Sequence, residues 1–462
     1  MTTHAVQQTR VSSFDHRALL IWLLCWVILP NIGFCLLWMI GAPSRMTEIF
    51  VIGALGMLTR NQSYAVRCTI LMSSILYSVL SFLSGLFNLP VWSLIGSVRY
   101  LTEMEPCGSA FYLIAGGLAA ANLAVAIKAL HYDARLKDDL SMLLALGGVV
   151  ALTGVDQAIA FNNRGAYARA MAGEQVFDSG VRRSGFATKP SQGRHLMLVM
   201  VESMGLPLDR GFRDQLFARW RAKDVRHRYQ VMMGTSPFAG STTNAEMRAL
   251  CDRWAGYEEV IDMTDRGCLP ARLRAMGYTT SAYHSFDGGL FDRNRWYGHI
   301  GFDTTHFRDE LYASGASACG GIFPGACDRD VPAIMARQLK TATKPQFLYW
   351  LTLNTHLPVP AEAALHTISC REGVPPVVQA SVMICRQFML WTELQQALAD
   401  QLVAADFPDT DILIVGDHMP PYFLRAERQQ FDDQQVPWIL LRARHVRDQR
   451  TTGTGRVTVT RD

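Results

Sequence analysis

Long apolar segments fill the first third of this 462-residue chain and end near residue 160. About 20 apolar residues cross a bilayer as a helix. Five segments are candidates for such spans: 18–41, 46–59, 68–88, 108–130 and 141–160. Beyond them Asp, Arg, Gly and Pro reach the frequencies of a soluble protein. The sequence therefore predicts a five-helix transmembrane domain over 1–160, followed by a globular domain.

Positive charge flanks the predicted spans on one side. These residues are Arg10 and Arg17 before the first span, Arg60 and Arg67 between the second and third, and Lys128, Arg135 and Lys137 between the fourth and fifth. Cytoplasmic flanks collect Lys and Arg, so we expect a multi-pass inner-membrane protein with a cytoplasmic N-terminus. Its globular domain would be extracytoplasmic, which means periplasmic in a Gram-negative cell. The first span is too long for the apolar region of a cleaved signal peptide.

Cysteine usage agrees with export. Six of the ten cysteines lie in the globular part, as three neighbouring pairs: Cys251 with Cys268, Cys319 with Cys327, and Cys370 with Cys385. Nearest-neighbour disulfides are the simplest of the fifteen possible connectivities, and buried free thiols are the alternative. The net charge is only +4 and no basic stretch is interleaved with aromatic residues, so we expect no nucleic-acid partner.

The globular part alternates between two kinds of segment. Strand patterns occur at 195–201, 278–283, 346–353 and 411–415, and helix-length segments at 209–222, 267–276, 329–340 and 379–404. This alternation predicts an α/β domain with a mainly parallel sheet flanked by helices. We place a polar linker at 161–194, the domain at 195–440 and an exposed tail at 441–462.

Two of these apolar strands end abruptly in residues that can bind a metal. The first runs into Glu202 and Ser203, and the last runs through Gly416 into Asp417 and His418. The carboxyl ends of parallel strands form the edge at which ligands bind. We therefore expect Glu202, Asp417 and His418 to converge on a cation.

A small, hydroxyl-rich turn, residues 234–246, leads into a helix and places Thr242 near the helix N-terminus. A hydroxyl at this position is ordinarily an N-cap. If the turn approaches the cation, however, the metal and the helix N–H groups can activate Thr242 as a nucleophile.

Histidines follow two other strands. His284 closes one strand and Arg293 comes soon after it, which together would make an anion clamp, because guanidinium grips phosphate through two hydrogen bonds. Surface salt bridges around an aromatic loop are the alternative. His356 lies just past a further strand, and a single His in isolation is more often structural than catalytic.

In this order the segments resemble the alkaline phosphatase and sulfatase superfamily, most closely its membrane-bound branch of lipoteichoic acid synthases and periplasmic phosphoglycerol or phosphoethanolamine transferases. The resemblance covers residues 195–440, and the five-span anchor matches that branch as well. It implies the following site: Glu202, Thr242, Asp417 and His418 as metal ligands, Thr242 as the nucleophile, and His284, Phe291, Arg293 and His356 around the headgroup. Phe291 stands where the phosphoglycerol branch has Trp.

The segment Cys268-Leu269-Pro270-Ala271-Arg272 fits the Cys-x-Pro-x-Arg pattern in which sulfatases convert Cys to formylglycine. Its position is wrong for that role, because it lies in a helix that the family places well after its nucleophile. Cys268 also has a disulfide partner available in Cys251. We therefore do not expect sulfatase chemistry at Cys268.

The resemblance implies a phosphotransferase that moves a phospho-headgroup, phosphoglycerol in preference, from a membrane phospholipid to a glycan or glycolipid acceptor. The reaction would pass through a phospho-threonine intermediate, with His356 donating the proton or hydrogen-bonding the phosphate. Its one divalent cation would be Mn²⁺, Mg²⁺ or Zn²⁺. The alternatives are a phosphoethanolamine transferase, a sulfatase- or phosphodiesterase-type hydrolase, and a membrane-anchored protein that binds glycans or a partner without catalysis.

Overall fold

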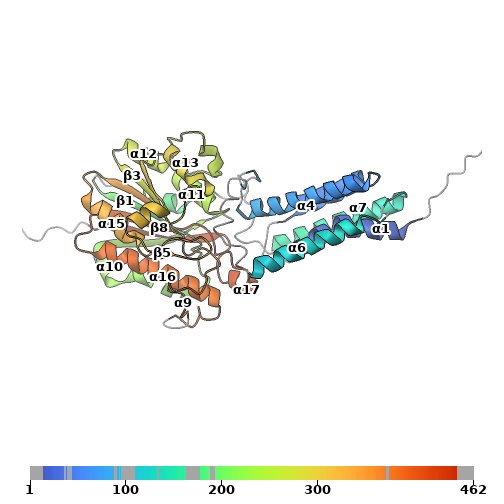
Figure 1. The fold of residues 1–462 in the computed structure, drawn as a ribbon. Helices are drawn as coiled ribbons and strands as arrows, with labels where there is room; N and C mark the ends of the chain where they lie inside the picture. The colour runs from blue at the N-terminus through green and yellow to red at the C-terminus, as the bar shows by residue number, and fades with distance from the viewer. Residues whose placement is uncertain are drawn as a thin grey trace, which may run out of the picture.

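A computed structural model describes residues 14–35, 44–87, 110–132, 135–162, 177–187, 193–370 and 374–444, together with residues 38, 91, 92 and 94. The described chain has two parts, a group of apolar helices and an α/β domain (Figure 1). The predicted tail falls largely outside the described residues. The predicted linker at 161–194 is wrong in part, because Gly180–Ser184 form a helix and Phe186 is buried in the core of the α/β domain. Residues 441–443, which were assigned to the tail, belong to the last strand of the sheet.

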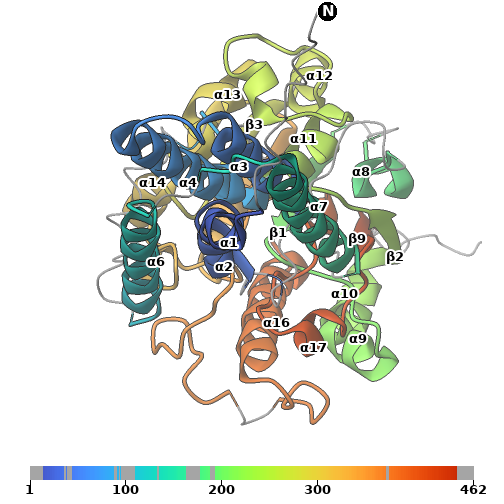
Figure 2. The same ribbon diagram turned by 90° about the vertical axis from the view of Figure 1, so that its right-hand side faces the viewer.

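Apolar helices make up the N-terminal part, grouped together in the end-on view of Figure 2. Their bounds are His16–Leu23 (α1), Leu24–Ile28 (η1), Leu29–Cys35 (α2), Met46–Leu58 (α3), Tyr64–Phe87 (α4), Ala110–Ala129 (α6) and Asp139–Asn162 (α7). Within the described residues three stretches are long and apolar enough to cross a membrane: His16–Phe34, Tyr64–Gly85 and Asp139–Ala160. Met46–Leu58 and Gly116–Ala129, the latter within the 20-residue α6, are shorter described apolar stretches. Three of the five predicted spans thus meet the length and hydropathy expected of a membrane helix within the described residues.

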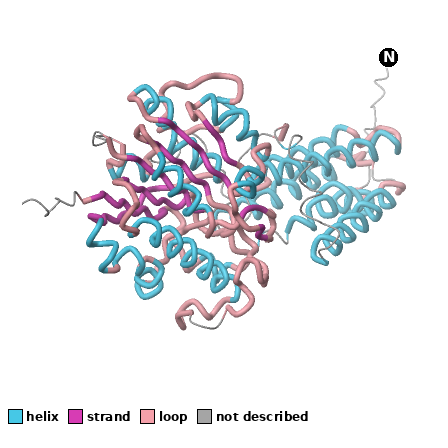
Figure 3. The backbone as a smooth tube through the Cα atoms, turned by 60° about the vertical axis from the view of Figure 1, so that its left-hand side comes forward, coloured by secondary structure: helices cyan, strands magenta, loops and turns pink. Residues whose placement is uncertain are grey.

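A seven-stranded sheet forms the centre of the α/β domain (Figure 3). Its strands are His195–Val201 (β1), Tyr229–Pro237 (β2), Thr279–His284 (β3), Thr304–His306 (β4), Gln346–Leu351 (β7), Thr410–Gly416 (β8) and Gln435–Ala443 (β9). Their order is β2-β9-β8-β1-β7-β3-β4. Strand β9 is antiparallel to both of its neighbours, and the other pairings are parallel. The prediction of a mainly parallel sheet is confirmed.

Helices cover both faces of the sheet. Their bounds are Gly180–Ser184 (α8), Arg210–Leu216 (α9), Ala218–Arg221 (η5), Lys223–Arg228 (α10), Thr242–Cys251 (α11), Tyr257–Val260 (η6), Leu269–Ala275 (α12), Leu290–Asp292 (η7), Arg293–His299 (α13), Arg308–Ala313 (α14), Val331–Thr341 (α15), Val382–Val403 (α16) and Arg425–Arg428 (α17). Figure 1 shows α11, α12 and α13 on one side of the sheet and α9, α10 and α16 on the other.

Strand β1 shows why the apolar runs become central strands. Alternate residues point to opposite faces of a strand, and both sets are buried. Leu196, Leu198 and Met200 join the core under α11 to α13, while Val199 and Val201 join the core under α9, α15 and α16. A strand that is buried on both faces has to be apolar throughout, which is the pattern of a central parallel strand.

The carboxyl edge of the parallel strands faces the apolar helices. Helix α17, which follows β8, lies at the side of the domain next to these helices (Figure 1). Three disulfides also lie in this domain, Cys251–Cys268, Cys319–Cys327 and Cys370–Cys385, as the nearest-neighbour pairing predicts.

Candidate active site

Glu202 and Asp417 are brought together by the pairing of β1 with β8. Val201 is in register with Gly416, so the residue that follows each strand emerges at the same place on the sheet edge. The main chain then turns around the Asp417 carboxylate, because Ser203 N and His418 N donate to its Oδ1 at 2.7 and 2.6 Å. Ser203 turns the chain with a φ of 55°.

The donor atoms of Glu202, Asp417 and His418 all lie within 4.8 Å of one another, and all three residues are buried. His418 Nε2 is 3.5 Å from Oε1 of Glu202 and 3.3 Å from Oδ2 of Asp417. Asp417 Oδ2 is a buried oxygen that accepts no hydrogen bond. Burial and the nearby Glu202 carboxylate raise the pKa of Asp417 well above its usual range. An orphaned oxygen beside a second buried carboxylate and an imidazole fits a divalent cation.

Thr242 faces this cluster from the first turn of α11. Its Oγ1 donates to Oε2 of Glu202 at 3.0 Å and lies 3.4 Å from His418 Nε2. Ser241, and not Thr242, is the N-cap of the helix and forms a capping box with Asn244. The Thr242 hydroxyl is therefore not used as the cap, and it points at the predicted metal ligands.

Gly240 allows the tight turn that leads into α11. Its φ is +75°, and a Cβ at this position would lie 2.3 Å from the Asn244 side-chain oxygen. Glycine is the residue that adopts such a conformation without steric cost. The small residues of the turn therefore have a geometric role beside the hydroxyl that they present.

Three further residues hold the ligand-bearing backbone, and sequence reasoning did not assign roles to them. Thr352 Oγ1 accepts from Glu202 N at 3.0 Å, and Thr355 Oγ1 donates to Glu202 O at 2.6 Å. Arg248 Nη2 donates to Asp417 O at 3.1 Å. Burial lowers the pKa of Arg248 to about 10, so the guanidinium keeps its charge at neutral pH. The two threonines belong to the same segment as His356. Their closeness to His356 in the sequence is the feature that could have indicated their role.

His356 lies close enough to Glu202 and His418 for their charges to affect its pKa. Its Nδ1 is 2.8 Å from Leu357 O, so the neutral ring carries its proton on Nδ1 and leaves Nε2 as an acceptor. Burial lowers the pKa of His356, and the Glu202 carboxylate partly opposes that effect. The ring is therefore neutral at pH 7 and can accept a proton.

His284 and Arg293 are buried deeper than an open anion clamp would require. His284 is 3 % exposed, and its Nδ1 lies 3.1 Å from Leu351 O. Arg293 is 2 % exposed and directs Nε and Nη2 to Oε2 of Glu246 at 3.1 and 2.9 Å. Phe291 adopts a φ of 56°, and its ring lies 5.3 Å from the Arg293 guanidinium carbon. Arg293 is thus paired with Glu246 of α11 and contacts Phe291, while His284 is bonded to the end of β7.

The sulfatase-like pattern at Cys268 is occupied by a structural bond. Cys268 forms a disulfide with Cys251, and this pair links the end of α11 to the start of α12. A disulfide-bonded sulfur is not a substrate for conversion to formylglycine. Asp265 lies beside the same two cysteines, but sulfurs joined to each other offer no thiolate to a metal.

Comparisons with known proteins identify the family of the α/β domain. Residues 194–452 match the Sulfatase family. A Rhizobium meliloti (strain 1021) protein, provisionally assigned to cyclic beta-1,2-glucan modification, is 26% identical over 192 residues, which are 40% of this chain and 29% of that protein. The chain thus matches less than a third of that relative's length.

Solved structures share the fold. The integral membrane lipooligosaccharide phosphoethanolamine transferase A (EptA) from Neisseria meningitidis superposes over 94% of this chain and 89% of its own, with a TM-score of 0.51 and 12% identity. The lipoteichoic acid synthase LtaP from Listeria monocytogenes superposes over 55% of this chain and 67% of its own, with a TM-score of 0.42 and 15% identity. The superfamily expected from the sequence is confirmed, and the chain belongs to the Sulfatase family.

Proposed function

We propose that this protein transfers a phospho-headgroup from a membrane phospholipid to an extracytoplasmic glycan or lipid acceptor through a phosphorylated Thr242. The observation that carries the proposal is the position of the Thr242 hydroxyl, 3.0 Å from Glu202 and 3.4 Å from His418, at the N-terminus of α11. A hydroxyl placed between metal-ligand side chains and helix N–H groups is suited to attack phosphorus.

Glu202, Asp417, His418 and the Thr242 oxygen would hold one divalent cation, Mn²⁺, Mg²⁺ or Zn²⁺. Such an ion lowers the pKa of a coordinated hydroxyl and neutralises charge on the attacked phosphate. Thr242 is the first residue of α11, and a helix N-terminus stabilises negative charge.

The chain's own residues account for both halves of the reaction. First, Thr242 Oγ1 forms a bond to phosphorus while the bond to the diacylglycerol oxygen breaks, and the proton lost by Thr242 is matched by the proton that diacylglycerol gains. Then the acceptor hydroxyl forms a bond to phosphorus, the bond to Thr242 breaks, and the acceptor proton returns to Thr242. His356, whose Nε2 is available, would carry the proton in each step.

Four residues would supply the headgroup side of the site. His284, Phe291, Arg293 and His356 are the residues proposed to line it, and we favour phosphoglycerol over phosphoethanolamine.

Donor lipids that carry each headgroup distinguish the two transferases, and added acceptor glycan distinguishes a transferase from a hydrolase of the same fold. A glycan-binding protein without activity would fold normally in chelator and purify without metal.

The membrane arrangement follows from the same proposal. We infer five crossings with a cytoplasmic N-terminus, a globular domain on the outer face and a linker between the last crossing and α8. The carboxyl edge of the sheet faces the apolar helices (Figure 1), as a site that takes a lipid donor requires. Protease treatment of intact spheroplasts should cleave the globular domain and spare the N-terminal segment.

Mass spectrometry tests the central step. The full-length protein in detergent with Mn²⁺ is incubated with phosphatidylglycerol or with phosphatidylethanolamine, and the peptide that contains Thr242 is analysed. A mass gain on Thr242 identifies both the nucleophile and the headgroup. A Thr242→Ala protein that still releases diacylglycerol at the wild-type rate would refute the mechanism.

A further inference from the structure

A disulfide-closed hairpin contacts His356. Strands Ala318–Cys319 (β5) and Gly325–Ala326 (β6) pair in antiparallel fashion, and the Cys319–Cys327 disulfide joins them at the base. The turn between them presents Phe323, whose ring centroid lies 4.8 Å from that of His356, at 87° to it. The same ring lies 5.4 Å from that of Phe286, in a small apolar cluster. The turn thus supplies one wall of the His356 environment.

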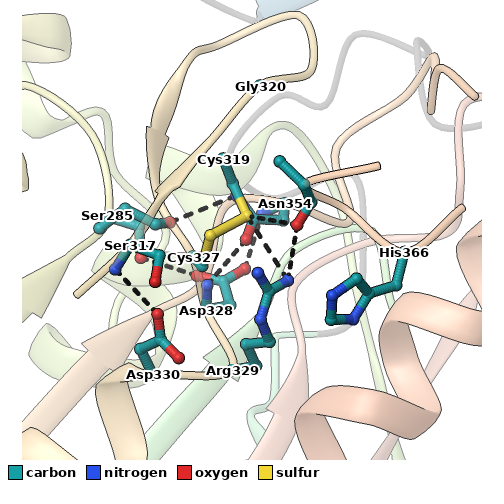
Figure 4. Close-up of a disulfide and its surroundings, with 12 residues drawn as sticks. Ser285, Ser317, Cys319, Gly320, Cys327, Asp328, Arg329, Asp330, Asn354 and His366 are labelled. Carbon is teal, nitrogen blue, oxygen red and sulfur yellow. Dashed lines mark hydrogen bonds between the residues drawn. A yellow bond between two sulfur atoms is a disulfide. The ribbon is translucent and has the colours of Figure 1, made fainter. Parts of the chain in front are cut away.

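Asp328, directly after the disulfide, ties the hairpin to two strand ends (Figure 4). Its Oδ1 accepts from Ser285 Oγ at 2.7 Å. Its Oδ2 accepts from Leu353 N at 2.8 Å and Asn354 N at 2.6 Å. Ser285 follows His284, and residues 353 and 354 lead directly to His356. A single carboxylate, 3 % exposed, therefore connects the ends of β3 and β7.

The segment after His356 holds the hairpin from its other side. Glu362 accepts from Gly320 N and Gly321 N at 3.0 and 3.1 Å. Arg329 Nη1 donates to Ala364 O at 2.7 Å. A Cβ at Gly320 would lie against the Glu362 carboxylate, so glycine gives that carboxylate room to reach the two N–H groups. The chain before His356 and the chain after it are both bonded to the hairpin region.

We propose that the hairpin is a positioning device for His356, with Phe323 orienting the imidazole ring and Asp328 fixing the backbone that carries it. The inference deepens the proposed function, because it concerns the residue assigned there to proton transfer. Phe323 and Asp328 are positioning residues, since they act through His356. The Cys319–Cys327 bond keeps the turn that bears Phe323 at a fixed distance from Asp328.

Kinetics give the first test, on the full-length protein in detergent with Mn²⁺. Phe323→Ala should lower kcat for diacylglycerol release at least about tenfold, because misplaced proton-transfer groups lose rate. It should leave KM within about twofold and the bound metal unchanged. Phe323→Tyr, which keeps the ring, should stay close to wild type, as should the matched turn variant Ile322→Ala. A Phe323→Ala protein with wild-type kcat would overturn the proposal.

Chemical modification gives a second test that needs no catalytic assay. Diethylpyrocarbonate should modify His356 at least about threefold faster in Phe323→Ala than in wild type, since the ring loses its cover. The exposed His366 should react equally in both and is the internal control. Equal His356 reactivity would refute the positioning role. If wild type releases no diacylglycerol from any donor, the proposed function fails, and the modification rates still decide this inference.

The disulfide itself is tested with the double variant Cys319→Ser/Cys327→Ser. It should reproduce the fast modification of His356 and the loss of kcat, whereas Cys370→Ser/Cys385→Ser should not. Circular dichroism establishes that each protein is folded. If the first double variant does not fold, the Phe323 series decides the question alone.

Discussion

Arg293 and Glu246 form an ion pair inside the domain, with Nη2 and Oε2 2.9 Å apart and side chains 2 % and 0 % exposed. Tyr349 donates to the other carboxylate oxygen at 3.1 Å, and Tyr297 donates to that oxygen as well. Because Glu246 lies one helical turn beyond Thr242, this network fixes the helix that carries the proposed nucleophile.

Removing one partner of this pair should be costly. Arg293→Met leaves the Glu246 carboxylate buried without its cation, and we expect the free energy of unfolding to fall by about 3–5 kcal/mol. The double variant Glu246→Gln/Arg293→Met should recover part of that loss, because no charge is left unpaired. Urea unfolding followed by tryptophan fluorescence measures both. A loss below about 1 kcal/mol in the single variant would show that the pair is not the anchor described.

Thr242 and Ser241 are adjacent hydroxyl residues with different expected effects. Thr242→Ala should lower diacylglycerol release by at least about 10³-fold and leave stability nearly unchanged, because the hydroxyl is not the helix cap. Ser241→Ala should retain the nucleophile and lose about 1 kcal/mol of stability through the cap. Turnover and unfolding measurements on the two variants check this. Equal activity losses would contradict the assignment.

The Asp417→Asn variant distinguishes the effect of Asp417 on metal binding from its effect on the stability of the metal-free protein. After dialysis against Mn²⁺, wild type should retain the ion in elemental analysis and the variant should not. In chelator it should be as stable as wild type or more so, because a buried carboxylate next to Glu202 is removed. Wild type should gain about 2.7 kcal/mol at a Mn²⁺ concentration 100-fold above Kd, and the variant should gain nothing. A variant that still binds Mn²⁺ would exclude Asp417 as a ligand.

His284 should make stability fall in acid. Burial, with the nearby Arg293 charge, places its pKa well below the usual value in the folded protein. Below about pH 6.5 the unfolded chain therefore binds a proton that the folded chain does not, and stability is lost as pH falls. Compared with His284→Gln, wild type should lose up to about 1.4 kcal/mol more per pH unit between pH 6 and 5. Parallel stability curves would show that His284 is not neutral in the fold.

The central sheet could be predicted because its strands carry their own signal. Strands β1 and β8 contain the apolar runs 196–201 and 412–415, and their predicted ends agree with the structure to within a residue. Strands β2, β9 and the three-residue β4 were missed. Gly234 and Pro237 interrupt the strand pattern of β2, and Pro437 and Arg442 interrupt that of β9. Both strands lie toward one edge of the sheet, where such residues are tolerated.

The site residues could be predicted where a metal-binding side chain comes directly after a strand. Glu202, Asp417 and His418 could be placed together because parallel strands end at a common edge. The ion pair of Glu246 with Arg293 could not be predicted, because it depends on how α11 and α13 pack over the sheet. Asp328 was missed for the same reason, because its acceptor role appears only when β3 and β7 lie beside the hairpin.

The adjacency of β1 and β8 also limits when the site can exist. Val201 and Gly416 are 215 positions apart in the sequence, yet they are in register in the finished sheet. During synthesis, Glu202, which follows the first strand, must wait until nearly all of the domain has been made. A chain truncated before β8 lacks Asp417 and His418, so it cannot assemble the proposed metal site. Metal uptake therefore reports that the domain has been completed.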